Sequence, residues 1–353
     1  GKLADIAIIC TMDRDHYEPT LKALQLGYHV LLEKPMSPNP KECIEMDLAA
    51  KKYGRQLALC HVLRYTDFWS TIKKIVSEGK IGDIVSIQLN ENVGIMHYVH
   101  SFVRGNWKNK EQSSPMILQK SCHDMDILNF IMSKKCKRVS SFGSLLYFKK
   151  ENAPKGAPLR CLDGCPAEQT CPFHAGRYYL SKGSFRATDD TSREGIIKAL
   201  QETDFGKCVF HSANDVVDHQ VVNLEYENGA TATFSMCGFT RDTTRIVQIM
   251  GTKGELRGNM IENKITFYDF LTKQETVINF EEPTSGHGGG DDNIVRNFLR
   301  DVEFGGDHES ISSSSVSLSS HLMAFAAEES RLNNGKPIDL DEYYFSILNN
   351  SLT

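Results

Sequence analysis

The first sixty residues alternate between short apolar runs and amphipathic segments. Apolar runs this continuous are typical of strands that a parallel sheet buries on both faces, and they occupy residues 4–10, 29–32 and 57–62. The intervening segments, residues 16–26 and 38–53, carry apolar side chains at helical spacing and are closed by Gly27 and Gly54. Strand, helix, strand, helix, strand predicts a doubly wound parallel sheet of the Rossmann type.

From residue 64 onward the pattern changes to alternating strands with few helices between them. Successive strands without helices imply antiparallel pairing. Strand-like runs occupy residues 84–89, 138–149, 207–211, 218–226, 230–238, 245–250 and 264–269, and helical patterns occupy 68–77, 292–304 and 315–333. The fold class is therefore α/β, with a parallel sheet followed by a mainly antiparallel one.

The chain has no glycine-rich turn of the kind that holds a dinucleotide pyrophosphate after the first strand. It starts directly with the tail of a connection into a buried strand. We therefore expect two βαβ-sized units, on the order of 30 residues each, to be missing upstream.

Composition agrees with an intracellular globular enzyme. The net charge of −5 provides no basic surface for nucleic acid. No apolar run approaches the ~20 residues that span a membrane, and no signal peptide is visible. We expect a cytoplasmic protein that binds neither nucleic acid nor membrane.

Glu33-Lys34-Pro35 directly follows the apolar run that ends at Leu32. Lys34 would then lie at the carboxyl end of a parallel strand, where open α/β sheets bind their ligands. The peptide bond to Pro35 is of the type that adopts the cis form at modest cost, which permits a turn that directs Lys34 toward the ligand.

A second cluster of polar residues lies in the segment 116–130. At 3.6 residues per turn, Gln119 and His123 share a helix face, and Asp126 lies one turn beyond His123. Hydride transfer from an alcohol needs a base for the hydroxyl proton and a cation to stabilise the alkoxide. Lys34 and His123 can fill these roles, although a lone histidine in such a segment is ordinarily a core residue.

The segments 11–16, 27–35 and 123–126 resemble the motifs of the glucose-fructose oxidoreductase and inositol dehydrogenase (Gfo/Idh/MocA) family. The resemblance implies a Rossmann domain, of which 1–63 would be the remaining C-terminal part, and a substrate-binding and oligomerisation α/β domain, 64–353, with a large open sheet. It also implies NAD or NADP and a carbohydrate substrate. The implied cofactor-binding residues are Thr11, Asp13, His16, Glu33, Lys34 and Pro35.

One position departs from the family pattern. In much of the family an aspartate precedes the histidine by four residues, and here that position is Gln119, which cannot take a proton. Either the neighbouring Lys120 substitutes for it, or the usual lysine-aspartate-histidine arrangement does not apply. The predicted catalytic residues are Lys34, Lys120 and His123.

The segment 97–107 is dense in aromatic and hydrogen-bonding groups on what periodicity suggests is a loop. Such a segment suits a polyhydroxylated ligand. Alternatively, its aromatic residues are core anchors and its arginine forms an internal ion pair. The candidate substrate-binding residues are Tyr65, His97, His100, Arg104, Trp107 and Gln119.

Cys161, Cys165 and Cys171, followed by His174, form a cluster in an irregular segment. Clustered thiols in a reducing compartment favour metal over disulfides, so these four side chains are a candidate zinc site. Reduced thiols without metal are the alternative.

The leading interpretation is an NAD(P)-dependent oxidoreductase acting on a sugar, inositol or related carbohydrate. An NAD-dependent glycosidase of the same fold and a non-catalytic sensor or scaffold are the alternatives. One exposed face on a large antiparallel sheet would commonly be buried in a homo-oligomer, a dimer or tetramer.

Overall fold

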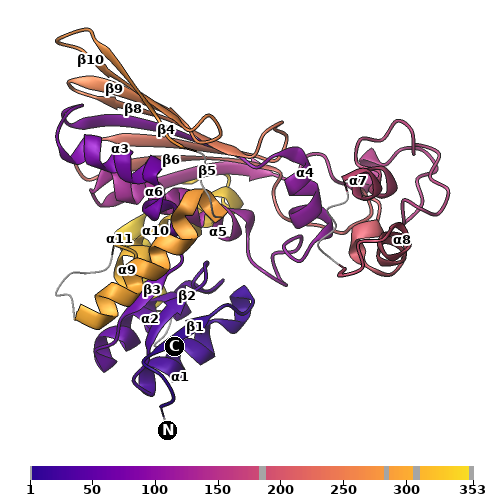
Figure 1. Ribbon diagram of the computed structural model, residues 1–353, viewed down its shortest axis with the longest axis horizontal. Coiled ribbons are helices and arrows are strands. Elements are labelled where there is room, and N and C mark those ends of the chain that lie inside the picture. Colours follow the sequence, from indigo (N-terminus) through magenta and orange to yellow (C-terminus); the bar gives the residue numbers. More distant parts are fainter. Residues whose placement is uncertain (1, 183–187, 282–285, 305–310, 350–353) are drawn as a thin grey trace.

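The computed structural model of the chain describes residues 2–182, 188–281, 286–304 and 311–349. It contains a three-stranded parallel sheet and a nine-stranded mixed sheet, with a layer of helices between them (Figure 1). Gly1 and 350–353, which the predicted domains include, lie outside the described residues. Within the described ranges no helix is both long and apolar enough to cross a membrane.

The N-terminal part has the predicted order of strands and helices. Its elements are β1 (Ile6–Ile9), α1 (Tyr17–Gln25), β2 (His29–Leu32), α2 (Pro40–Tyr53) and β3 (Leu57–Leu59). The strands pair in parallel in the order β1-β2-β3. The Asn39 side chain caps α2 by accepting a hydrogen bond from Lys41 N, and Gly54 ends the helix in the left-handed conformation. β3 is shorter than predicted because the chain enters a 3₁₀ turn, η2 (Val62–Tyr65).

The second sheet has the order β11-β10-β9-β8-β4-β7-β6-β5-β12. It is antiparallel except for the pair β4–β7, which confirms a mainly antiparallel sheet. Its strands are β4 (Ile84–Asn92), β5 (Cys136–Ser144), β6 (His219–Tyr226), β7 (Thr231–Cys237), β8 (Thr244–Gly251), β9 (Gly254–Asn259), β10 (Lys264–Asp269), β11 (Glu275–Asn279) and β12 (Ile338–Asp339). The strand patterns of β9 and β11 were not recognised in the sequence.

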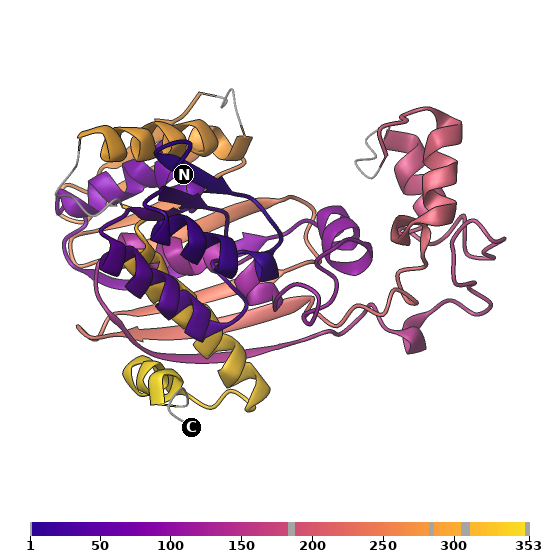
Figure 2. The ribbon, with the colours of Figure 1, turned by 90° about the horizontal axis from the view of Figure 1, so that it is seen from below.

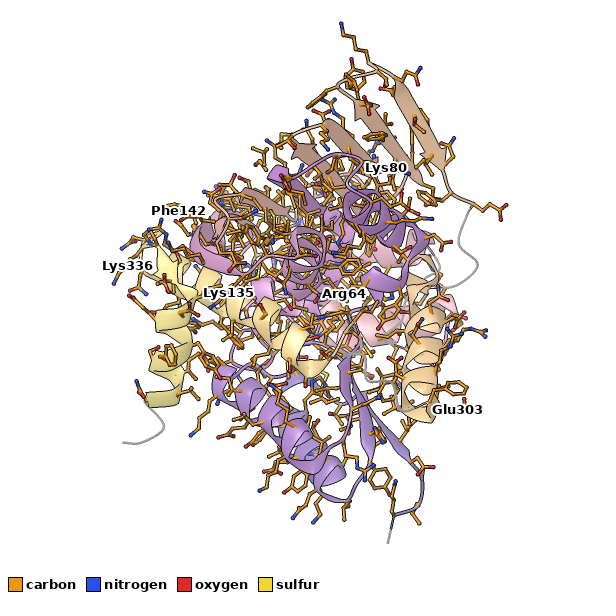
Figure 3. The ribbon with its side chains drawn as sticks, turned by 90° about the vertical axis from the view of Figure 1, so that its left-hand side faces the viewer. Arg64, Lys80, Lys135, Phe142, Glu303 and Lys336 are labelled. Atoms are coloured by element: carbon orange, nitrogen blue, oxygen red, sulfur yellow. The ribbon has the colours of Figure 1, made fainter. Side chains whose placement is uncertain are left out.

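Helices cover one face of this sheet (Figure 1). They include α3 (Asp67–Ser77), α5 (Met116–Gln119), α6 (Cys122–Met132), α10 (Ser314–Leu332) and α11 (Leu340–Asn349). Helix α9 (Gly290–Phe304) packs instead on η2 and the parallel sheet. The opposite face carries exposed apolar side chains, among them Val85, Phe142, Val221 and Ile246. Phe142 stands at the outer edge of the molecule in Figure 3.

A small lobe built on α7 (Ala175–Lys182) and α8 (Arg193–Glu202) stands apart from the two sheets (Figure 2). It has its own apolar cluster, in which Tyr179 and Leu200 are buried. The predicted strand at 207–211 is wrong, because Lys207 forms only an isolated bridge with Arg160. The predicted loop at 97–107 is also wrong over most of its length, since it continues α4 (Ile95–Tyr98) as a π-helix, Val99–Arg104.

The chain returns to the parallel sheet near its C-terminal end. Leu59 N donates to Ser312 O at 2.9 Å, and Ser313 bridges to Ala58. The hydroxyls of Ser314 and Ser315 both donate to Asp47 on α2 at 2.8 Å. Residues 312–315 thus contact the segment 1–63, although they belong to the predicted second domain. The domain boundary at residue 63 stays a prediction.

Two substitutions on β4 should separate its buried face from its exposed one. Ile87 is fully buried, whereas Val85 is exposed because the strand register is irregular between Ile84 and Ser86. Ile87→Ala should lower the free energy of unfolding by about 2–5 kcal/mol, since it leaves a cavity, whereas Val85→Ala should change it by about 0.5 kcal/mol or less. Urea unfolding of both variants provides the measurement. Equal losses would contradict the facing of this strand.

Candidate active site

Lys34 stands at the carboxyl end of β2 and reaches across to the second part of the chain. Its Nζ donates to Gln119 O at 3.1 Å, and its backbone N–H donates to the Glu33 carboxylate at 3.2 Å. The Lys34–Pro35 peptide bond is cis. The structure thus brings Lys34 to Gln119, 85 residues further along the chain, in the segment that also carries His123.

His123 lies in the first turn of α6 and is 6% exposed. Burial lowers the pKa of its imidazole well below the ordinary value, and the nearby positive charges of Lys34, Arg245 and Lys120 lower it further. The ring is therefore neutral near pH 7. Its Nδ1 is buried without a hydrogen-bond partner among the described residues.

Lys120 lies between these two groups, at the end of α5. Its Nζ is 3.4 Å from Glu91 Oε1, and its side chain is 18% exposed. Burial lowers the pKa of the Lys120 ammonium, Glu91 opposes this, and the charges of Arg245 and Lys34 add to it. The structure thus brings all three predicted catalytic residues, Lys34, Lys120 and His123, into one electrostatic cluster.

A buried ion network around Glu91 positions Lys120. Arg245 on β8 places Nη2 2.9 Å from Glu91 Oε2 and Nε 2.7 Å from Asp124 Oδ1. Burial raises the pKa of Asp124 to about 6, against the attraction of the Arg245 guanidinium. Glu91 and Arg245 were missed in the sequence. The signal for Glu91 was its place in the alternation of β4, where a carboxylate occupies a position facing the core.

A second buried network lies on the other side of His123. Arg64 binds both carboxylate oxygens of Asp126, with Nε 2.6 Å from Oδ2 and Nη2 2.7 Å from Oδ1. His61, which follows β3, places Nδ1 2.8 Å from the same Oδ1. Burial alone would raise the pKa of Asp126, but Arg64 and His61 hold it well below its ordinary value. Arg64 lies in the interior of the molecule in Figure 3.

The predicted cofactor-binding residues form the carboxyl edge of β1 and β2. The ring nitrogens of His16 lie 2.8 Å from Pro35 O and 3.0 Å from Thr11 O, so this side chain joins the two strand ends. Asp13 is buried and accepts hydrogen bonds from Ser113 Oγ at 3.0 Å, Ser114 Oγ at 2.9 Å and Gln119 Nε2 at 3.3 Å. The cofactor role of this edge stays a prediction.

Gln119 was also a candidate for binding substrate. Because its amide nitrogen bonds to Asp13, its side chain holds the end of β1 against α5. Its Oε1 is buried without a partner among the described residues. The hydrogen bond to Asp13 therefore determines the directions in which Nε2 and Oε1 of Gln119 point.

The other candidate substrate residues lie elsewhere. The Arg104 guanidinium is buried, donating to Lys207 O at 2.8 Å and Phe173 O at 2.7 Å, and so it anchors the small lobe. Its neighbours pack in the same region: His100 stacks on Phe205 and bonds to Tyr179, and His97 and Trp107 pack beside Phe102. Tyr65 is buried in an apolar cluster against α9 and bonds to Ser312 Oγ at 2.8 Å. These contacts match the alternative reading of core anchors, except that Arg104 binds carbonyls and no carboxylate.

The structure contradicts the predicted zinc site. Among the described residues, which include Cys161, Cys165, Cys171 and His174, no three or more cysteines, histidines or carboxylates are placed to hold a metal ion. His174 is used up by the backbone, since Nε2 lies 2.8 Å from Cys161 O and Nδ1 accepts from Arg177 N. The Arg104 guanidinium, 3.6 Å from Cys161 Sγ, would repel a cation there.

Removing the negative charge of Glu91 should destabilise the protein strongly. Glu91→Gln leaves Arg245 and Lys120 with one carboxylate fewer in a buried network, which should lower the free energy of unfolding by about 3–5 kcal/mol. Glu255→Gln on β9 is the matched control, because its partner Arg257 is largely exposed and such pairs contribute about 0–1 kcal/mol. Chemical denaturation compares the two, and equal effects would contradict the importance of the buried network.

Two family models match the chain. The NAD-binding Rossmann fold of an oxidoreductase family matches residues 2–61, and the C-terminal alpha/beta domain of the same family, Gfo/Idh/MocA, matches residues 73–340.

Similar proteins include the putative oxidoreductase YteT of Bacillus subtilis, 26% identical over 81% of this chain and 70% of the relative. The scyllo-inositol 2-dehydrogenase (NADP+) IolW of B. subtilis is 34% identical over 30% of this chain and 28% of its own length. Among solved structures, levoglucosan dehydrogenase in complex with NADH and levoglucosan aligns with a TM-score of 0.68 and 16% identity, over 95% of this chain and 80% of that one. At this identity the structural likeness shows the fold alone.

The second family model covers most of the chain, and the first covers the β1–β3 sheet. The chain therefore belongs to the Gfo/Idh/MocA family of oxidoreductases.

Proposed function

We propose that this protein is an NAD- or NADP-dependent oxidoreductase that transfers hydride between nicotinamide and a sugar, inositol or related carbohydrate. The observation that carries the proposal is the meeting of Lys34 with Lys120 and His123, which lie in a separate segment, 116–130. They gather beside the carboxyl end of β2, where open parallel sheets bind their ligands.

The residues of this edge fit part of a dinucleotide site. Cys10, Thr11 and Met12 at the end of β1 are exposed, so a ligand can reach the strand ends. No glycine-rich turn is present in the 353 residues to hold the phosphates. When bound, the nicotinamide would supply the hydride acceptor or donor. The Cys10–Met12 edge and Lys34 would help to hold the cofactor.

The charges of the site suit the oxidation of a secondary alcohol. His123 is neutral and can accept the hydroxyl proton, because Lys34, Lys120 and burial keep it unprotonated. Lys34 and Lys120 provide positive charge for the alkoxide that develops as the hydride leaves. Lys120 is the neighbour of Gln119, which occupies the position of the aspartate in the family pattern, and it would contribute positive charge to the site.

The relatives support the substrate class. Besides IolW and levoglucosan dehydrogenase, similar proteins include a 1,5-anhydro-D-fructose reductase of Ensifer adhaerens and a D-glucoside 3-dehydrogenase of Escherichia coli. Their names pair a dehydrogenase or reductase activity with an inositol, an anhydrosugar or a glucoside. A cyclic polyol or glycoside is therefore the class to test first.

The open face of the nine-stranded sheet favours a homo-oligomer. Exposed apolar side chains from four strands, at Val85, Phe142, Val221 and Ile246, are what a second copy would cover. We expect a dimer or tetramer by size-exclusion chromatography with light scattering. Phe142→Glu should shift the measured mass toward that of a monomer. A monomeric mass for the wild-type protein would contradict the proposal.

The catalytic assignment predicts a graded loss of turnover. With NAD+ and NADP+ and a panel of inositols, anhydrosugars and glycosides, the full chain as its gene encodes it should reduce nicotinamide. Lys34→Met, Lys120→Met and His123→Ala should each lower kcat by ~10²-fold or more, since each removes a positioned acid-base or charged group. Gln119→Ala should do less harm.

Lys74→Met on the exposed side of α3 is the control and should leave turnover unchanged. Wild-type turnover in the Lys34 and His123 variants would rule out the assignment. Cleavage of a glycoside without net reduction of nicotinamide would instead favour the NAD-dependent glycosidase. Failure to turn over any of these substrates, with tight binding of a regulatory ligand, would favour the sensor.

A further inference from the structure

Behind His123 lies a second imidazole that the proposed chemistry does not yet use. The rings of His61 and His123 are neighbours, with centroids 5.9 Å apart at an interplanar angle of 61°. Both rings are buried. Each has one buried nitrogen without a partner among the described residues, Nε2 of His61 and Nδ1 of His123.

The hydrogen bonds of His61 determine where its proton lies. Its Nδ1 lies 2.8 Å from the Asp126 carboxylate and 3.2 Å from Ser317 Oγ. The carboxylate is ionised because Arg64 also binds it. Nδ1 must therefore carry the hydrogen and donate it to Asp126. In the neutral ring, Nε2 of His61 is then a free lone pair that can accept a proton.

The tautomer of His123 follows from the same reasoning. Its Nδ1 is buried without a partner among the described residues, and the His61 ring is its neighbour at 5.9 Å between centroids, whereas Nε2 is not a buried atom that lacks a partner. A hydrogen on Nδ1 can be accepted by the lone pair of His61. The lone pair of His123 Nε2 is then left to receive the proton of a substrate hydroxyl.

We propose that His61, held by Asp126, is a positioning residue and proton relay behind His123. The proposal rests on the proposed oxidoreductase function. During alcohol oxidation the substrate O–H bond breaks and a bond forms between its hydrogen and His123 Nε2. The bond from His123 Nδ1 to its own hydrogen breaks, and that proton forms a bond with His61 Nε2. Asp126 then faces the resulting imidazolium of His61. A bound nicotinamide would supply the acceptor for the hydride of the substrate C–H bond.

The charges around His123 explain why a relay is needed. Positive charge on this ring is disfavoured by Lys34 at the end of β2, by His61 when it is charged, by Arg245 on β8 and by Lys120 directly after α5. Asp124 on α6 is committed to Arg245, and His287 lies 6.4 Å away on the remaining side and is bound to Asp291.

Asp126 therefore offers His123 a negative charge through His61. The two rings are not directly hydrogen-bonded in this structure, and such catalytic contacts commonly tighten when substrate binds.

The third histidine of the group is not part of the relay. His321 on α10 stacks on His61 at 5.5 Å, but its two nitrogens are occupied. Nδ1 donates to Ser317 O at 2.7 Å, and Nε2 accepts from Met36 N at 3.0 Å. Burial lowers the pKa of His321 to about 3, so this ring stays neutral. It is the natural control for a substitution at His61.

His61→Asn is the sharpest test, because an asparagine amide can still donate to Asp126 in place of Nδ1 but has no counterpart of Nε2. The variant should fold, with a melting temperature close to wild type, while kcat falls by ~10²-fold and KM for the carbohydrate changes by about threefold or less. The acidic limb of the pH dependence of kcat should move to lower pH, since His123 alone is a weaker base with a lower pKa. His321→Asn should keep the wild-type pH profile.

A second readout does not depend on turnover. Imidazole ¹⁵N spectra of histidine-labelled protein report which ring nitrogen carries the hydrogen. Wild type should show His61 and His123 as the Nδ1–H tautomers, and His61→Asn should leave His123 as a mixture. The relay is overturned if His123 carries its hydrogen on Nε2 in wild type, or if His61→Asn keeps the wild-type kcat and pH profile. If wild type oxidises no carbohydrate but the tautomers are as described, the proposed substrate class fails and the hydrogen-bond chain stands.

Discussion

The buried carboxylate of Asp126 is the constraint on which the arrangement of this protein depends. Arg64 binds both of its oxygens, His61 binds one of them, and Ser320 Oγ lies 3.4 Å from the same oxygen. These partners come from the end of β3, from η2 and from α10, so one charge joins the parallel sheet to the helices that cover the large sheet. Removing one partner of a buried pair is strongly destabilising, because the remaining charge has no solvent to stabilise it. The three partners are therefore held in a single geometry.

Helix α6 carries Asp126 together with the catalytic candidate His123, so the contacts of Asp126 also fix the position of His123. His123, Asp124 and Asp126 lie within one turn of each other and point in different directions. Asp124 faces Arg245 and the large sheet, and Asp126 faces Arg64 and the parallel sheet. His123 lies between two ion networks that hold the helix on both sides. These short contacts fix the position of the His123 ring, and acid-base catalysis requires such fixed positions.

The segment 97–107 shows how the same residue types serve structure and binding. Arginine, histidine and tryptophan suit a carbohydrate site, but they suit equally well the attachment of a lobe with a small core of its own. Buried Arg104 satisfies two backbone carbonyls of that lobe, and His100 packs between Phe205 and Tyr179. The lobe contains one small apolar cluster, so these polar and aromatic contacts supply much of its connection to the sheets.

Local pattern determined the elements that repeat within a few residues of each other. Apolar runs, helix spacing and terminal glycines predicted β1 through α2 and most of the large sheet, because these signals act through neighbouring residues and need no knowledge of distant partners. The spacing of Lys120, His123 and Asp126 could likewise be predicted, since a helix turn is a local geometry.

Only the tertiary structure decided what those residues contact. Arg245 and Asp124 are 121 residues apart, and Arg64 and Asp126 are 62 apart. Ion pairs over such separations leave no periodic signal, and the cysteine cluster shows the converse, where closeness in sequence did not produce a shared site because His174 and Arg104 had other partners.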